Sequence, residues 1–190
     1  MPEIPLIVCI TGMPGAGKTT AAEALKIIGF RIISMGDVIR EEAIRQGIEL
    51  DDVNLGNLML KLRKERGPGA IAYLIAEKIQ SDHGKLVAID GLRSPHEVDV
   101  LNKHGKVKVL AIDASKETRF RFLKERGRSD APKSQEEFDA RDKRELDVGV
   151  REAISAADDI ISNDNITIED LKAKVLEIVG GWVKRFEEGS

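Results

Sequence analysis

The sequence has little of what several classes of protein depend on. It contains a single cysteine, Cys9, so no disulfide can form within the chain and a disulfide scaffold is excluded. Aromatic residues make up 4% of the 190 residues, and no apolar run approaches the roughly 18 residues that a membrane-spanning helix needs. The net charge of −3 argues against a nucleic-acid partner held by bulk positive charge.

What is present is the composition of one folded domain. Hydrophobic residues make up 42% of the chain, which is enough for a core and too much for a disordered protein. The N-terminus shows no basic segment followed by an apolar stretch and a small-residue cleavage site, so we expect a cytoplasmic protein.

Strand-like and helix-like segments alternate along the chain. Short apolar runs predict strands at residues 5–11, 31–34, 85–90, 107–113 and 159–162. The segments between them predict helices at 18–28, 37–46, 51–66, 70–80, 95–103, 116–125, 134–146 and 168–188. This order predicts an α/β fold, with a five-stranded parallel sheet and helices on both faces. Three helices between two strands, at 36–81, predict a small substrate-binding insert.

One segment fits the phosphate-binding pattern G-x-x-x-x-G-K-[ST], between the first predicted strand and the first predicted helix. Glycines in such a loop let backbone N–H groups point at phosphate oxygens, and the following helix adds the positive end of its dipole. Lys18 would reach the β- and γ-phosphates of ATP, and the Thr19 hydroxyl would bind Mg²⁺. The predicted cofactor-binding residues here are Gly12, Met13, Pro14, Gly15, Ala16, Gly17, Lys18, Thr19 and Thr20.

Two other interpretations of this region fail. The dinucleotide pattern G-x-G-x-x-G would need a third glycine where Thr20 stands. A GTPase would need an Asn-Lys-x-Asp segment, and residues 102–105 begin this way but end in Gly105. They also lie before a strand rather than after one, so we treat that match as a coincidence.

Two further segments place charged residues where an α/β protein binds its ligands. Asp90 ends an apolar strand at the carboxyl edge of the sheet, where it could hold Mg²⁺ through water or orient an acceptor. Arg93 follows and could grip a second phosphate, whereas the alternative is a strand-end aspartate that caps the next helix. Residues 34–40 start a helix capped by Ser34 or Asp37, with Arg40 either solvated or bound to an acceptor's phosphate.

Six arginines gather between residues 119 and 144, interleaved with acidic residues. Such a run is typical of solvated helix faces with i,i+4 ion pairs. Gly127 and Pro132 break the helical pattern, so the segment could instead form a hinged lid that closes over transferring phosphates. We expect phosphate contacts from Arg126, Arg128 and Arg141, and pairing with neighbouring acids from Arg119, Arg121 and Arg144.

Together these segments resemble the nucleoside monophosphate kinase family, and adenylate kinases most closely. Residues 33–40 (ISMGDVIR) look like the family's ISTGD-x-x-R, residues 90–93 (DGLR) look like its DGFPR, and Arg128-Ser-Asp with Arg141 resembles its late R-x-D-D … R pair. A group of archaeal proteins related to adenylate kinase is the most similar overall, and the likeness to dephospho-coenzyme A kinase is fainter.

The resemblance implies a role for each matching residue. Arg40 and Arg93 would hold the acceptor's phosphate, and Arg128 and Arg141 would bridge the donor and acceptor phosphates. The predicted catalytic residues are Lys18, Asp90, Arg128 and Arg141, the predicted metal ligands are Thr19 and Asp90, and the predicted substrate-binding residues are Asp37, Arg40, Gly91 and Arg93.

The chain also departs from the family's pattern. Met35 replaces the family's threonine beside the monophosphate, and Arg93 falls one residue early. The glutamine that reads adenine in the family is missing, with Glu97 and Val98 in its neighbourhood, and the short lid has no zinc-binding cysteines. These differences leave the acceptor's base open.

The sequence thus predicts one P-loop kinase-like domain over residues 1–190, with a helical acceptor-binding insert at 36–81 and an arginine-rich lid at 119–144. Its predicted activity is the Mg²⁺-dependent transfer of the γ-phosphoryl group of ATP to a small acceptor, with a nucleoside monophosphate such as AMP favoured. Two alternatives stay open: a kinase of a coenzyme-precursor hydroxyl with Asp90 as base, and a nucleotide-binding sensor with little catalysis. The expected partners are small-molecule nucleotides. The sequence does not indicate which oligomeric state the protein adopts.

Overall fold

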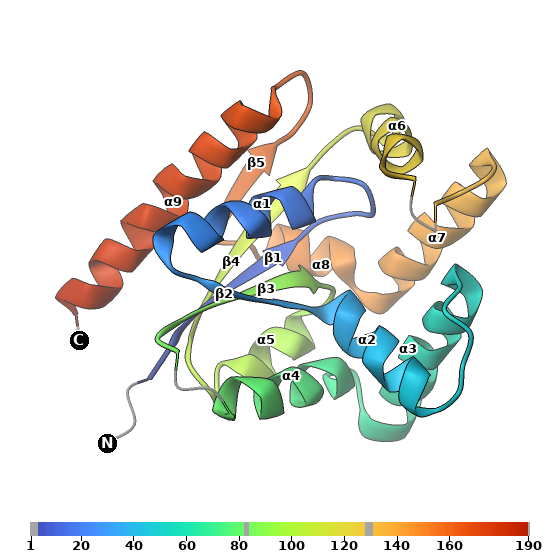
Figure 1. The fold of residues 1–190 in the computed structure, drawn as a ribbon, viewed down its shortest axis with the longest axis horizontal. Helices are drawn as coiled ribbons and strands as arrows, with labels where there is room; N and C mark the ends of the chain where they lie inside the picture. Colours follow the sequence, from blue (N-terminus) through green and yellow to red (C-terminus); the bar gives the residue numbers. More distant parts are fainter. Residues whose placement is uncertain (1–3, 82–83, 128–130, 190) are drawn as a thin grey trace.

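The computed structural model of the protein describes residues 4–81, 84–127 and 131–189. Its centre is one parallel sheet of five strands in the order β2-β3-β1-β4-β5 (Figure 1). The predicted five-stranded parallel sheet is therefore confirmed. The strands are β1 Leu6–Thr11, β2 Arg31–Ser34, β3 Leu86–Leu92, β4 Lys106–Asp113 and β5 Asp159–Ser162.

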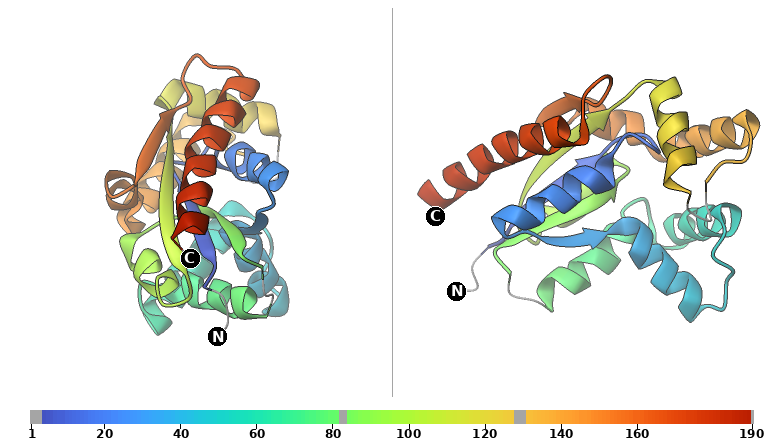
Figure 2. Two further views of the ribbon diagram at one scale, coloured as in Figure 1. Left: turned by 90° about the vertical axis from the view of Figure 1, so that its left-hand side faces the viewer. Right: turned by 45° about the horizontal axis from the view of Figure 1, so that its top comes forward.

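Helices cover both faces of this sheet, as predicted. The left view of Figure 2 shows the sheet nearly edge-on, with α1 and α9 on one side and α5 and α8 on the other. The helices of the described residues are α1 Lys18–Ala24, continued by a 3-10 turn at Leu25–Ile28, α2 Met35–Arg45, α3 Asp52–Arg66, α4 Ala70–Gln80, α5 Pro95–Leu101, α6 Lys116–Arg126, α7 Gln135–Val148, α8 Val150–Ser155 and α9 Ile168–Glu188.

The central strand β1 divides the hydrophobic core into two halves. All six of its residues are buried, because it pairs with β3 and β4 and has helices on both faces. Leu6, Val8 and Ile10 pack into the half beneath α1 and α9. Ile7 and Cys9 point to the opposite face, into the half beneath α2, α4 and α5. The run of five apolar residues from Leu6 to Ile10 is therefore used on both faces of the sheet.

Two groups of helices extend beyond the carboxyl edge of the sheet. The helices α2, α3 and α4 lie between β2 and β3 in the chain, and α6 and α7 follow β4. The right view of Figure 2 shows α6 and α7 above α2 and α3 at the same end of the molecule. The end of β1, where the phosphate-binding pattern begins, therefore lies at the same end of the molecule as α2, α3, α6 and α7, whereas α4 packs beneath the sheet.

Several element boundaries differ from the sequence prediction, and one helix was not predicted. The helix α2 begins at Met35, because Ser34 rather than Asp37 is its N-cap and accepts the backbone N–H of Asp37. The strand β3 continues to Leu92, past the predicted end at residue 90. The helix α8 was not predicted; it follows Gly149, whose φ of +116° ends α7 and turns the chain.

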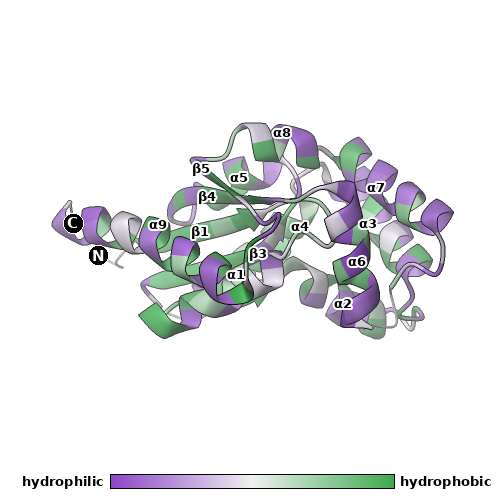
Figure 3. Ribbon diagram, turned by 90° about the horizontal axis from the view of Figure 1, so that it is seen from above, coloured by the Kyte–Doolittle hydropathy of each residue, from purple (hydrophilic) through white to green (hydrophobic). Residues whose placement is uncertain are grey.

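Hydropathy follows this layered arrangement. Figure 3 shows the strands mostly in the hydrophobic colour, while the surrounding helices carry most of the hydrophilic colour. No helix in the described part of the chain is long and apolar enough to cross a membrane.

Candidate functional site

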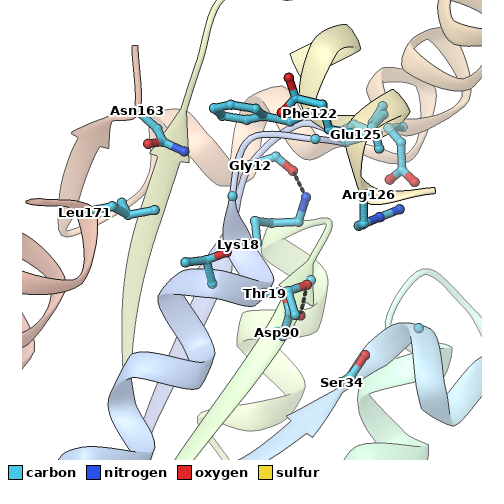
Figure 4. Close-up of a pocket in the computed structure, with 18 of the residues that line it drawn as sticks. Gly12, Lys18, Thr19, Ser34, Asp90, Phe122, Glu125, Arg126, Asn163 and Leu171 are labelled. Carbon is cyan, nitrogen blue, oxygen red and sulfur yellow. Dashed lines mark hydrogen bonds between the residues drawn. The ribbon is translucent and has the colours of Figure 1, made fainter. Parts of the chain in front are cut away.

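The phosphate-binding pattern forms a closed loop between β1 and α1. Gly12, at its start, has a φ of +148°, and a Cβ there would lie 2.2 Å from the carbonyl oxygen of Ile112 in β4. The Lys18 ammonium turns back into the loop, where its Nζ donates to the carbonyl oxygens of Gly12 at 2.8 Å and Met13 at 2.9 Å (Figure 4). The loop thus surrounds the Lys18 ammonium. The backbone at its start, at Gly12, has a conformation and a close neighbour that only glycine allows.

Burial lowers the pKa of Lys18 to about 8, although the negative charges of Asp90 and Glu145 act in the opposite direction. A bound phosphate would favour the charged form of the amine. The loop therefore holds a lysine whose charge depends on pH in the mildly alkaline range.

Thr19 and Asp90 meet at the floor of the site. The Thr19 hydroxyl donates to Asp90 Oδ2 at 2.8 Å, and Asp90 is buried near the end of β3. The capping alternative for Asp90 is wrong, since Ser94 is the N-cap of α5. Hydroxyl and carboxylate oxygens are ligands that suit Mg²⁺ together with waters and substrate phosphates. No cluster of three or more His, Cys, Asp or Glu able to hold a metal occurs among the described residues. The pair therefore fits a Mg²⁺ ion that arrives with a nucleotide.

Arg93, directly after β3, is held in place by two hydrogen bonds. Its Nε donates to Glu145 Oε2 at 2.8 Å, and its Nη1 donates to the carbonyl oxygen of Gly91 at 2.9 Å. Gly91 has a φ of +100° and lies where the register between β1 and β3 shifts. Burial alone would raise the pKa of Glu145, but the nearby positive charges, first among them Arg93, hold that pKa below its usual value. Arg93 and Glu145 are therefore a charged pair in which Glu145 is buried and Arg93 is partly buried.

Arg40 is more accessible than Arg93. Its Nη1 lies 2.6 Å from Asp37 Oδ1 on the same helix, and about one third of the Arg40 side chain is exposed. Asp37 is mostly exposed and lines a neighbouring cavity together with Arg40. Arg40 can therefore exchange Asp37 for another anion without leaving a buried carboxylate behind.

A cavity of about 440 Å³ brings most of the predicted residues together. Those that line it are Gly12, Pro14, Gly15, Gly17, Lys18, Thr19, Thr20, Arg40, Asp90, Gly91, Arg93, Arg126 and Arg141. Three predicted residues are not among its walls. Met13 instead offers its carbonyl oxygen to Lys18, Ala16 is buried behind the loop, and Asp37 faces the neighbouring cavity. Arg128 lies outside the described residues.

The predicted lid is tied to the phosphate loop by a buried ion pair. Arg119 of α6 makes two hydrogen bonds to Asp142 of α7, at 2.8 and 2.7 Å, and a third to the carbonyl oxygen of Pro14 at 3.1 Å. Arg119 was expected to pair with a neighbouring acid; its partner lies 23 residues away and both side chains are buried. This pair fixes α7 against the loop, next to Arg141 in the sequence.

The sequence analysis missed several side chains that line the cavity near the phosphate loop. Asn163, just after β5, donates from Nδ2 to the carbonyl oxygen of Ala16 at 2.9 Å. Figure 4 shows Asn163 and Leu171 beside the loop, with Phe122 of α6 above it. Ile166 and Ile168 also line the cavity. These apolar side chains could pack against a planar base, but in the sequence they look like ordinary core residues.

Glu97 does not replace the missing adenine-reading glutamine. Its carboxylate is fully buried and accepts the backbone N–H groups of Arg93 at 2.7 Å and Ser94 at 3.1 Å. Its other oxygen accepts from Arg63 Nη2 at 2.8 Å. One carboxylate oxygen of Glu97 therefore positions the backbone at Arg93, and the other pairs with Arg63.

Comparisons with known proteins agree with this architecture. A family model described as an AAA domain matches residues 11–139. A UPF0200 protein of Pyrococcus abyssi is 46% identical over 165 residues, which cover 84% of this chain and 88% of the relative. A UPF0200 protein of Pyrococcus horikoshii is 42% identical over 179 residues, which cover 92% of this chain and 96% of the relative.

Solved structures match the fold over nearly the whole chain. The structure of TT1252 from Thermus thermophilus gives a TM-score of 0.65 at 22% identity, covering 94% of this chain and 98% of that one. Shikimate kinase from Acinetobacter baumannii, in complex with shikimate, gives 0.59 at 16% identity and covers 95% of each chain. The predicted P-loop kinase-like fold is confirmed, and the particular relation to adenylate kinases stays a prediction.

The buried pair between α6 and α7 generates a stability prediction. Asp142→Asn would leave the Arg119 guanidinium buried without a counter-charge, so we expect the free energy of unfolding to fall by about 3–5 kcal/mol. Urea denaturation measures this, with Asp139→Asn on the exposed side of α7 as control, expected to change stability by less than about 1 kcal/mol. The double variant Arg119→Met with Asp142→Leu should recover most of the loss. Equal, small effects of Asp142→Asn and Asp139→Asn would show that the pair contributes nothing.

The lowered pKa of Lys18 predicts how nucleotide binding depends on pH. Above about pH 8 the Lys18 amine loses its proton, and with the charge it loses its attraction for phosphate. The Kd for Mg²⁺ with a non-hydrolysable ATP analogue should therefore rise with pH, approaching roughly tenfold per pH unit until the pKa of the complex is reached. Calorimetric titrations from about pH 7 to pH 9.5 measure this. Lys18→Met should bind more weakly with no such rise, and a flat profile for the native chain would contradict the assignment.

Proposed function

The chain belongs to the UPF0200 family, and from its site we propose that it is an ATP- and Mg²⁺-dependent phosphotransferase acting on a small phosphorylated acceptor. One observation carries this proposal: the phosphate loop with Lys18 and the arginines Arg40 and Arg93 open into the same cavity. Two groups of cations at one cavity suit two phosphorylated molecules brought end to end. A protein that binds one nucleotide would need only the first group.

Each part of the site has a role in this proposal. The loop and Lys18 would hold the donor's phosphates, and Thr19 with Asp90 would hold Mg²⁺, which neutralises charge on the β- and γ-phosphates when it is bound. Arg40 and Arg93 would hold the acceptor's phosphate. An acceptor oxygen would form the new bond to the γ-phosphorus as the bond to the β–γ bridging oxygen breaks, and that oxygen leaves on ADP with the electron pair.

The acceptor that we propose is a nucleoside monophosphate such as AMP. A phosphate acceptor is already ionised near neutral pH, so transfer needs positioning and charge neutralisation rather than a strong general base. Residues 36–81 would form the acceptor-binding insert and residues 119–144 the lid. Arg126 and Arg141 line the cavity from the lid side and would contact the transferring phosphates.

A second candidate is a kinase that acts on a hydroxyl group of a coenzyme precursor. The buried carboxylate of Asp90 favours this second candidate. It lies in the cavity and could accept the proton of the acceptor's hydroxyl group. The two candidates give different products, a diphosphate in the first case and a new phosphomonoester in the second.

The experiment is to incubate the protein with Mg²⁺-ATP and a panel of nucleoside monophosphates plus dephospho-coenzyme A, and to identify products by chromatography and mass. We expect a diphosphate from one acceptor and no product from Lys18→Met, which should retain the fold. Absence of product from every acceptor, with ATP binding still measurable, would contradict phosphotransfer and favour a nucleotide sensor.

Arg40 offers a sharper test of the acceptor site than Arg93. Removing Arg93 would leave Glu145 buried without its partner, so any loss could come from misfolding. Arg40→Met should raise the KM for the acceptor by about tenfold or more, since hydrogen bonds to charged groups contribute roughly 1.5–3 kcal/mol. The KM for ATP should stay within about twofold. Arg45→Met, an exposed change on the same helix, is the control. Equal effects of Arg40→Met on both KM values would reject the assignment.

A further inference from the structure

Asp52 places a carboxylate of the insert among the arginines of the acceptor side. It is the first residue of α3 and about one third exposed. It lines a smaller cavity, beside the main one, whose walls also include Arg40, Arg93 and Arg141. These three arginines line both cavities. Asp52 therefore lies where an anionic ligand of the same arginines would bind.

Two arginines of α7 hold this carboxylate. Arg144 Nη2 donates a short hydrogen bond to Asp52 Oδ2, and Arg141 Nε lies 3.6 Å from Asp52 Oδ1. The two arginines are three residues apart and lie on one face of α7. The sequence analysis expected Arg144 to pair with a neighbouring acid, but its partner lies 92 residues away. The ion pairs therefore join the insert to the lid.

A glycine makes room for this contact. Gly56 lies one turn after Asp52 on α3, and a Cβ at Gly56 would lie 3.3 Å from Nε of Arg144 and 3.7 Å from its Cδ. The Arg144 side chain therefore runs directly across the backbone of α3 to reach Asp52. This close approach is a second feature, independent of charge, that supports a built contact between α3 and α7.

We propose that Asp52 is an internal competitor for the acceptor's phosphate. With no acceptor bound, it occupies Arg141 and Arg144; an acceptor phosphate takes these arginines over and releases Asp52. The inference rests on the proposed function, because it assigns the acceptor side of that site. A phosphate with two negative charges and several acceptor oxygens can displace a single carboxylate, whereas a neutral hydroxyl cannot. Asp52 is thus a specificity-determining residue that favours phosphorylated acceptors.

The test measures anion binding rather than turnover. The phosphate loop is first filled with Mg²⁺ and a non-hydrolysable ATP analogue, and inorganic phosphate is then titrated by calorimetry. Asp52→Asn should bind phosphate at least about fivefold more tightly than the native chain, which is the lower end of typical coupling between sites. Glu49→Gln removes one exposed negative charge three residues away and should change the Kd by less than about twofold.

Two further variants keep the outcome clear. Asp52→Ser removes the carboxylate with another residue suited to the start of a helix, so it replaces Asp52→Asn if that variant unfolds. Asp52→Glu keeps a carboxylate and should bind phosphate nearly as weakly as the native chain. A Kd for Asp52→Asn and Asp52→Ser equal to that of the native chain would overturn the proposal, as would tightening of the same size in Glu49→Gln.

The result is separable from the outcome of the product assay. Tighter phosphate binding in Asp52→Asn, with no product from any acceptor, would support the competitor and reject phosphotransfer. Unchanged phosphate binding in Asp52→Asn, with a diphosphate product from the native chain, would reject the competitor and leave the proposed function standing.

Discussion

The structure depends first on how tightly the phosphate loop packs against its neighbours. Each of its three glycines approaches a different element: Gly12 lies against Ile112 of β4, and a Cβ at Gly15 would lie 2.5 Å from the carbonyl oxygen of Arg119 in α6. A Cβ at Gly17 would lie 2.5 Å from Nδ2 of Asn163, after β5. Because side chains are absent at these points, β4, α6 and the start of α9 can all close on the loop and fix its shape.

The parallel sheet brings the other half of the site to this loop. Asp90 in β3 is in register with Ile10 in β1 and with Ser34 in β2, so three strands approach this edge of the sheet side by side. The phosphate loop follows β1, and α2, which carries Arg40, follows β2. Residues far apart in the chain therefore meet because parallel strands place their carboxyl ends at one edge.

The local parts of this arrangement could be predicted from the sequence, whereas the long-range pairs could not. A strand, a glycine-rich loop and a helix are encoded in consecutive residues, and so is the position of Asp90 at a strand end. The partners of Arg93 and Arg144 lie 52 and 92 residues away, among many acidic residues of equal local appearance. The periodicity of a helix indicates which of its faces is polar. It does not indicate which acidic residue of another helix an arginine on that face will contact. The short helix α8 was missed for a related reason, since six residues carry too little periodicity.

In the proposed function, ion pairs on the acceptor side would shape recognition. Arg93 is paired with Glu145, Arg40 with Asp37 and Arg144 with Asp52. The Arg93–Glu145 pair gives a buried carboxylate its counter-charge, and all three pairs hold guanidinium groups in place. A ligand that binds these arginines must then displace their carboxylates. Its binding free energy is therefore the difference between its own interaction with the arginines and that of the carboxylates. Only an anion that offers more charge or more acceptor oxygens than a carboxylate gains from the exchange. The acids that leave therefore contribute to selectivity as much as the arginines that stay.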